Sequence, residues 1–151
     1  MIGHGVPGLD IRQEHEYPVA AAGVFAALTL GLDAWWPVDE RVIGPEGHLS
    51  LTAQLGAPLV EEAPGGQAAI WAVVDLVEPD RRLYLSGWFG VNGVVAGRVH
   101  FDLTDLETGS RLKLSHQAIG PVSEDVHSRR RAQWRRILDR SLREHLSGLS
   151  V

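Results

Sequence analysis

Cysteine is absent from the 151 residues. Disulfide bridges, thiolate nucleophiles and zinc sites with sulfur ligands are therefore excluded, and the composition suits a reducing cytoplasm. Long apolar runs are also missing. The longest nearly apolar stretch, residues 18–32, is shorter than the ~20 residues of a membrane helix and is predicted to be a buried helix. Residues 1–10 contain no basic stretch followed by an apolar run, so we expect a cytoplasmic protein without a secretory signal or a membrane span.

The motifs of several common enzyme classes are missing too. The sequence has no phosphate-binding loop, no Gly-x-Gly-x-x-Gly after a strand, no His-Glu-x-x-His and no nucleophile elbow. A redox or hydrolytic enzyme of a standard motif type is therefore not expected, and neither is a cofactor. The net charge of −5 argues against a general nucleic-acid binder.

Alternation and turn signals predict one strand, two helical segments, six further strands and a long helix. In the first strand, residues 9–17, apolar and charged positions alternate. A helix begins at Pro18 and ends at Gly31, and a short apolar turn, residues 32–36, follows it. The other predicted strands, separated by Gly and Pro turn signals, are residues 48–55, 58–63, 68–78, 82–89, 94–106 and 110–118.

The last predicted element is a helix over residues 123–146, with Trp134 and Leu138 on its apolar face and arginines opposite. Strands joined by short turns pair antiparallel, and such a sheet buries the apolar face of one long helix on its concave side. We therefore expect the α+β class. A curved antiparallel sheet of about six or seven strands would be wrapped around the C-terminal helix, with two short helices after the first strand. The length suits one domain, residues 1–151, with residues 1–8 flexible.

Short strings in a fixed order resemble a known superfamily. They are Tyr17-Pro18, Ala27-Leu28-Thr29, Trp35-Trp36-Pro37, Val77-Glu78-Pro79-Asp80-Arg81-Arg82-Leu83 leading into Gly87-Trp88, Thr108-Gly109-Ser110-Arg111-Leu112-Lys113-Leu114-Ser115-His116, and Trp134 with Ile137, Leu138 and Leu142. With these strings nearly the whole chain resembles the START/Bet-v-1-like (SRPBCC) superfamily. Within it, the chain is most similar to the branch of heat-shock-protein ATPase activator homologues and polyketide cyclase-like proteins.

The resemblance implies a helix-grip fold with a cavity between sheet and helix. The function it favours is binding of a small hydrophobic or aromatic molecule in that cavity. Two alternatives stay open: a cyclase or dehydratase that uses the same cavity, and a module that docks a chaperone or another protein partner. A superfamily with so many functions does not decide between them.

Strand parity places polar side chains on the inner face of the sheet. Because Leu112 and Leu114 share a face with His116, His116 is predicted to point toward the core. Gln13 and His15 share the inner face of the first strand in the same way. The resemblance implies that the first and last strands are neighbours, so we expect His15 and His116 to approach each other.

Each of these histidines has two interpretations. His116 is either a core residue that bonds a backbone carbonyl or a ligand-contacting residue whose near-neutral pKa suits it to proton transfer. In the second case His116 is the candidate catalytic residue. His15 has the same two interpretations. A metal site from the pair would need a third ligand that the sequence does not supply, so none is expected.

The aromatic residues have a structural and a functional interpretation as well. Core packing accounts for the five tryptophans, which are Trp35, Trp36, Trp71, Trp88 and Trp134. Trp134 is expected to touch a ligand in addition. Tyr84 and Trp88 share one face of their strand, and which face of the middle strands lines the cavity stays open. If it is theirs, they form an aromatic wall.

Arginines crowd the last helix, either as a solvated face or as a surface for a protein partner. Arg130, one turn before Trp134, could stand at the cavity mouth and pair with an acidic group of the ligand. A homodimer is compatible with the sequence. The candidate ligand-binding residues are Gln13, His15, Tyr84, Trp88, His116, Arg130 and Trp134.

Overall fold

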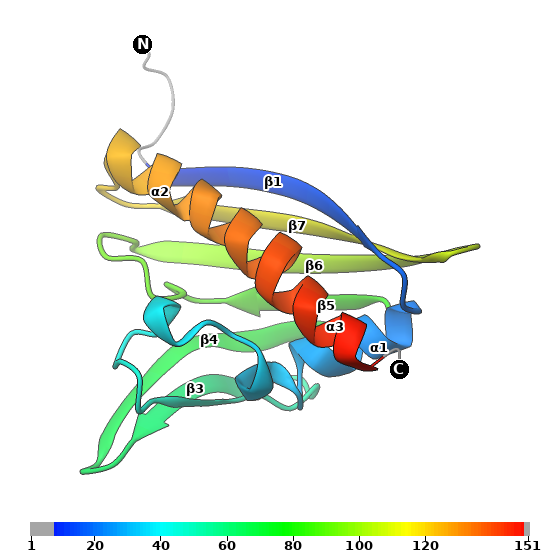
Figure 1. The fold of residues 1–151 in the computed structure, drawn as a ribbon. Coiled ribbons are helices and arrows are strands. Elements are labelled where there is room, and N and C mark those ends of the chain that lie inside the picture. Colours follow the sequence, from blue (N-terminus) through cyan, green and yellow to red (C-terminus); the bar gives the residue numbers. More distant parts are fainter. Residues whose placement is uncertain (1–7, 150–151) are drawn as a thin grey trace.

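A computed structural model describes residues 8–149. Its antiparallel sheet has seven strands in the order β1-β7-β6-β5-β4-β3-β2. The strands are β1 (Gly8–Tyr17), β2 (His48–Ser50), β3 (Pro58–Ala63), β4 (Gln67–Glu78), β5 (Arg82–Ser86), β6 (Ala96–Leu106) and β7 (Gly109–Ile119). The C-terminal helix crosses one face of this sheet, as Figure 1 shows. The predicted α+β helix-grip arrangement is confirmed.

The helical segments are α1 (Ala21–Leu28), η1 (Leu32–Ala34), η2 (Val38–Glu40), α2 (Glu124–Arg135), η3 (Arg136–Leu142) and α3 (Arg143–Leu149). The last three form one continuous helix, in which η3 has π-helical hydrogen bonding. Ser123 begins this helix as its N-cap, because its side chain accepts the N–H of Val126. The hydroxyl of Tyr17 donates to the carbonyl of Leu138 at 2.7 Å, which fastens β1 to the π-helical segment.

Several element bounds differ from the sequence predictions. The strand expected over residues 48–55 ends at Ser50, because a turn closed by Gln54 N–H and the carbonyl of Thr52 comes next. The strand expected over residues 82–89 ends at Ser86, since Phe89 adopts a φ of 51° that no strand allows.

The start of the first helix and the flexibility expected for Gly8 also differ from the sequence predictions. The first helix starts at Ala21 rather than Pro18. Of residues 1–8, which were expected to be flexible, Gly8 already pairs with Ile119 in the sheet. Residues 1–7 lie outside the described part of the chain.

The core lies between the concave face of the sheet and the helix. Burial alternates along β1 and β7, so one face of each strand faces the helix and the other faces solvent. The helix contributes Trp134, Ile137, Leu138, Leu142 and Leu146 to this core. Each such side chain adds ~1.5–3 kcal/mol when fully buried, which is why the helix stays on the sheet. Within residues 8–149, no helix is long and apolar enough to cross a membrane.

Candidate functional site

Aromatic rings fill the space between helix and sheet. The Trp134 ring lies 5.8 Å from Trp36, 5.7 Å from Phe89 and 6.0 Å from Phe101, measured between ring centroids. Trp71 joins them at 5.7 Å from Trp36 and 5.5 Å from Phe89. Most of these pairs meet edge to face, the arrangement that aromatic quadrupoles favour. We call these five residues together with His116 the aromatic cluster.

The cluster lies between sheet and helix, where the sequence analysis expected a cavity for a small molecule. A hollow of about 820 Å³ lies on the outer face of the sheet beside Trp88 and Arg98. Another, of about 600 Å³, lies beside Arg12 and Lys113 and is also lined by Gln13 and by Arg135 of α2. On the helix side, a hollow of about 190 Å³ lies between residues 90–92 and α2. The interior at this place is a packed aromatic cluster with a small hollow at its border.

His116 stands fully buried in the cluster, with 0% of its surface exposed, as its strand parity predicted. The indole Nε1–H of Trp134 donates to its Nδ1 at 2.9 Å. An indole nitrogen is only a donor, so Nδ1 must accept and the ring proton must sit on Nε2. Among the described residues, this Nε2–H has no hydrogen-bond partner.

The electrostatics of His116 differ from the expectation of a near-neutral pKa. Burial, assisted by the positive charge of Arg130, lowers its pKa to about 3. The ring is therefore neutral at physiological pH and a weak base. The arrangement makes His116 a neutral hydrogen-bond donor directed into the interior, and its acid–base role stays a prediction.

Arg130 lies one helical turn before Trp134 and is only 9% exposed. Burial lowers its pKa to about 10, which still leaves the guanidinium charged at neutral pH. No carboxylate oxygen of the described chain lies within 4.0 Å of it, and its Nε has no hydrogen-bond partner there. A buried charge without a counterion lowers the stability of a folded protein by several kcal/mol. We therefore expect Arg130 to destabilise the protein when no ligand is bound.

Trp36 supplies a third unpaired group, because its buried indole N–H finds no partner in residues 8–149. Its ring meets that of Trp134 at 89°. Buried polar groups are almost always hydrogen-bonded, so three exceptions in or beside one cluster mark a candidate site. Two more unpaired atoms, Nε of Arg41 and Nε2 of His100, belong to groups that have other bonds or a stacking partner.

Phe89, which sequence reasoning did not select, connects this cluster to the hollow. Its ring lies 6.0 Å from that of His116, and Gly90, the next residue, lines the hollow. A φ of 51° is rare for a bulky side chain and costs of order 1–3 kcal/mol. No sequence pattern predicts the positive φ of Phe89.

Gln13 and His15 face the helix as expected, but both are hydrogen-bonded. His15 Nε2–H donates to Gln13 Oε1 at 2.9 Å, and the Gln13 amide donates to the carbonyl of Arg131 at 3.0 Å. Burial lowers the pKa of His15, although Asp139 opposes the shift. These contacts join β1 to α2.

The expected approach of His15 to His116 is wrong, even though β1 and β7 are neighbours. His116 lies opposite Ile11, and His15 lies opposite Leu112. Four residues of strand separate the two positions, which is ~14 Å at ~3.4 Å per residue.

Tyr84 and Trp88 lie away from the helix. The Tyr84 ring stacks on His100 at 3.7 Å and its hydroxyl donates to Asp102 at 2.8 Å. The Trp88 indole donates to the carbonyl of Ile70 at 2.8 Å and borders the outer hollow. The aromatic wall considered for the concave face is therefore not formed, because the alternation of β5 turns Leu83 and Leu85 inward instead.

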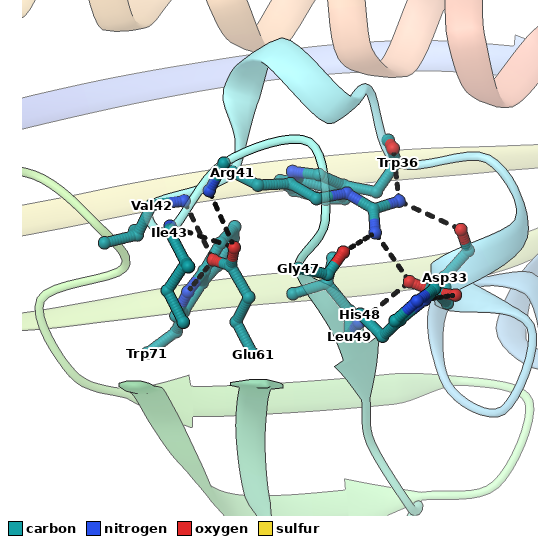
Figure 2. Close-up of polar contacts among 11 residues, drawn as sticks. Asp33, Trp36, Arg41, Val42, Ile43, Gly47, His48, Leu49, Glu61 and Trp71 are labelled. Atoms are coloured by element: carbon teal, nitrogen blue, oxygen red, sulfur yellow. Dashed lines mark hydrogen bonds and ion pairs between the residues drawn. The ribbon is translucent and has the colours of Figure 1, made fainter. Parts of the chain in front are cut away.

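A second buried polar group, Glu61, was missed by the sequence analysis. It is 0% exposed and accepts the backbone N–H groups of Val42 at 2.8 Å and Ile43 at 2.9 Å (Figure 2). It also accepts the indole N–H of Trp71 at 3.2 Å. The available signal was its parity: Glu61 shares a face of β3 with the buried Leu59.

Arg41 holds the same segment from the other side. Its guanidinium donates to the Asp33 carboxylate at 2.6 Å and to the carbonyls of Gly47 at 2.6 Å and Trp36 at 2.7 Å (Figure 2). These two networks fasten residues 33–47 to the sheet and position the Trp36 and Trp71 rings. Most polar atoms of Glu61 and Arg41 have hydrogen-bond partners within the protein. The candidate site differs, because three of its buried donors lack such partners in the described chain.

The arginines of the C-terminal helix are partly paired. Arg136 forms an ion pair with Glu40, Arg143 with Asp139 at 2.9 Å, and Arg140 with Glu144 at 3.9 Å. Over residues 8–149, no three His, Cys, Asp or Glu side chains are grouped so that they could hold a metal ion.

Sequence comparison identifies no relatives: no family model matches the chain, and no curated protein is significantly similar to it. Solved structures do match. Protein MLL2253 of Mesorhizobium loti is 17% identical with a TM-score of 0.69, over 91% of this chain and 96% of that one. Protein BH1534 of Bacillus halodurans is 23% identical with a TM-score of 0.66, over 91% and 96%.

A third match is DynU16, a protein of the dynemicin biosynthetic locus. It is 21% identical with a TM-score of 0.67, over 93% of this chain but 48% of that chain. At these identities the likeness establishes a shared fold and nothing finer.

Proposed function

We propose that this protein binds a small hydrophobic or aromatic molecule at the aromatic cluster, as a START/Bet-v-1-like domain spanning residues 1–151. One observation carries the proposal: Trp36 Nε1, His116 Nε2 and Arg130 Nε are buried in or beside the cluster without hydrogen-bond partners in residues 8–149. A bound molecule would supply the missing hydrogen bonds. The fold shared with DynU16, a protein of a biosynthetic locus, agrees with small-molecule binding.

The chemistry of the unpaired atoms defines what the ligand must offer. Both Trp36 Nε1 and His116 Nε2 are donors, so a ligand oxygen such as a carbonyl or phenol would satisfy them. The surrounding rings suit an aromatic or apolar body. Because the rings touch one another, a ligand has to separate them. Phe89 is the element we expect to move, since leaving its φ of 51° relieves strain.

Neither alternative function is supported by a specific contact. A cyclase or dehydratase would need a base near neutrality, and the pKa of His116 is about 3. A partner-docking helix face would need free arginines; Arg136, Arg140 and Arg143 have carboxylate partners, which leaves the exposed Arg129, Arg131 and Arg135 for that role. Ligand binding is therefore the function that we put forward.

The five indole N–H groups allow a direct test by NMR. Protein labelled with ¹⁵N is titrated with 2-acetylnaphthalene and 2-naphthol, each of which carries one oxygen on an aromatic body. We expect the Nε1–H signals of Trp36 and Trp134 to shift, while that of Trp88, on the outer face, serves as the internal control. The variant His116→Phe, which keeps a ring but removes the donor, should weaken binding at least tenfold. Shifts confined to Trp88, or no shifts at all, would overturn the proposal.

A further inference from the structure

We infer that the bound molecule is a carboxylic acid whose carboxylate pairs with Arg130 in the hollow between residues 90–92 and α2. This inference rests on the proposed function and narrows its ligand class. It starts from a contrast between buried charges. Glu61 accepts three backbone N–H groups and an indole, and Glu40 pairs with Arg136, whereas Arg130 has no ion-pair partner in the described chain.

The hollow beside Arg130 suits the head group of an acid. Its volume of about 190 Å³ corresponds to ~6 water molecules at ~30 Å³ each, which accommodates a carboxylate and a few carbon atoms. Gly90, Val91 and Asn92 line one side, and Arg129 and Gln133 of α2 line the other. The amides of Asn92 and Gln133 add neutral donors to the charge of the guanidinium.

The position of the hollow links it to the aromatic cluster. Phe89, directly before Gly90, lies 6.0 Å from the His116 ring and 5.7 Å from the Trp134 ring. Arg130 is also close enough for its charge to act on His116. A ligand whose carboxylate occupies the hollow therefore directs its apolar body toward the cluster.

Arginine favours a carboxylate in particular, because its planar fork donates two parallel hydrogen bonds to the two oxygens. The matching ligand class is an aromatic or apolar monocarboxylic acid. An uncharged analogue of the same shape would leave the guanidinium unpaired and would bind more weakly.

The experiment compares 2-naphthoate with its uncharged amide, 2-naphthamide, by isothermal titration calorimetry. We expect the wild-type protein to bind the acid at least tenfold more tightly than the amide. In Arg130→Met this preference should vanish, because affinity for the acid falls at least tenfold more than affinity for the amide. Arg131→Met, an exposed arginine of the same helix, removes an equal charge as the control and should keep the preference.

The outcomes separate the two proposals. Equal binding of acid and amide to the wild type, or a preference that persists in Arg130→Met, overturns the carboxylate inference alone. Failure of both compounds to bind overturns the proposed function and this inference with it. Unfolding without ligand gives an independent check: Arg130→Met should unfold at the same or a higher urea concentration than the wild type. A lower midpoint would show that Arg130 has a structural partner and would also overturn the inference.

Discussion

The indole N–H of Trp134 donates to Nδ1 of His116 across 2.9 Å and thereby joins the long helix to β7 inside the core. This bond determines the tautomer of the histidine, because Nδ1 is occupied as an acceptor and Nε2 must carry the proton. Replacing Trp134 by Phe keeps an aromatic ring but leaves Nδ1 without a donor. We expect Trp134→Phe to lower the free energy of unfolding by ~1–3 kcal/mol, measured by urea denaturation. A loss below ~0.5 kcal/mol would show that the bond contributes little.

The depressed pKa of His116 predicts how stability depends on pH. The pKa of His116 is about 3 in the folded protein and ordinarily 6.5. Between these pH values His116 is protonated in the unfolded chain and neutral in the folded chain. Keeping His116 neutral therefore does not reduce the free energy of unfolding above pH ~6.5. Below that pH the free energy of unfolding falls progressively, by at most ~1.4 kcal/mol per pH unit. Urea unfolding between pH 7 and 4.5 should show a shallower pH dependence for His116→Gln than for the wild type.

A control for this experiment is Gln117→Ala, next to His116 on β7, because it changes an exposed side chain and no titratable group. We expect this variant to keep the pH dependence of the wild type. Equal slopes for His116→Gln and the wild type would contradict the depressed pKa. The ring itself offers a second readout, because its ¹⁵N signals should report a neutral Nε2–H tautomer at every pH at which the protein stays folded.

Glu61 provides a separate prediction about the fold. Its fully buried carboxylate accepts three backbone N–H groups of the segment after Arg41 and the indole N–H of Trp71. In Glu61→Gln the amide directs an NH₂ group at donors and removes the negative charge, so we expect a loss of ~3 kcal/mol of unfolding free energy. The neighbouring, exposed Glu62→Gln should change it by less than ~0.5 kcal/mol in the same urea titration.

Periodicity in the sequence was enough to predict which face of β1 and of β7 is buried. In β1 and β7, charged and apolar residues alternate cleanly, and the prediction that His116 points inward is confirmed by its complete burial. The same reasoning could not orient Tyr84, because both faces of the neighbouring β4 are apolar: Val73 is 38% exposed and Val74 is 1% exposed. Which face of β4 and β5 is buried depends on which face the helix covers, and the local sequence pattern does not predict this.

Long-range packing explains the other differences from the sequence predictions. A pattern can place Trp36, Trp71 and Trp134 in a core, but it does not reveal that their rings leave little space between them. The pKa of His116 depends on burial and on Arg130, which is remote from it in sequence. The pairing of Asp33 with Arg41 occurs in an irregular segment without periodicity. These features arise from tertiary contacts.

The ion pair between Arg136 and Glu40 is expected to anchor the segment after α1 to the helix. The Glu40 side chain is 5% exposed and that of Arg136 is 46% exposed, so the carboxylate is the buried partner. Removing the arginine would leave this carboxylate buried without a cation, and we expect Arg136→Met to lower the free energy of unfolding by ~1–3 kcal/mol.

Arg140 and Glu144 form an exposed pair on the same helix, so Arg140→Met should lower the free energy of unfolding by at most ~0.5 kcal/mol. The double variant Glu40→Gln with Arg136→Met should regain part of the loss in urea unfolding, because the buried charge is removed with its partner. An equal cost for Arg136→Met and Arg140→Met would show instead that the anchoring pair contributes no more than a surface contact.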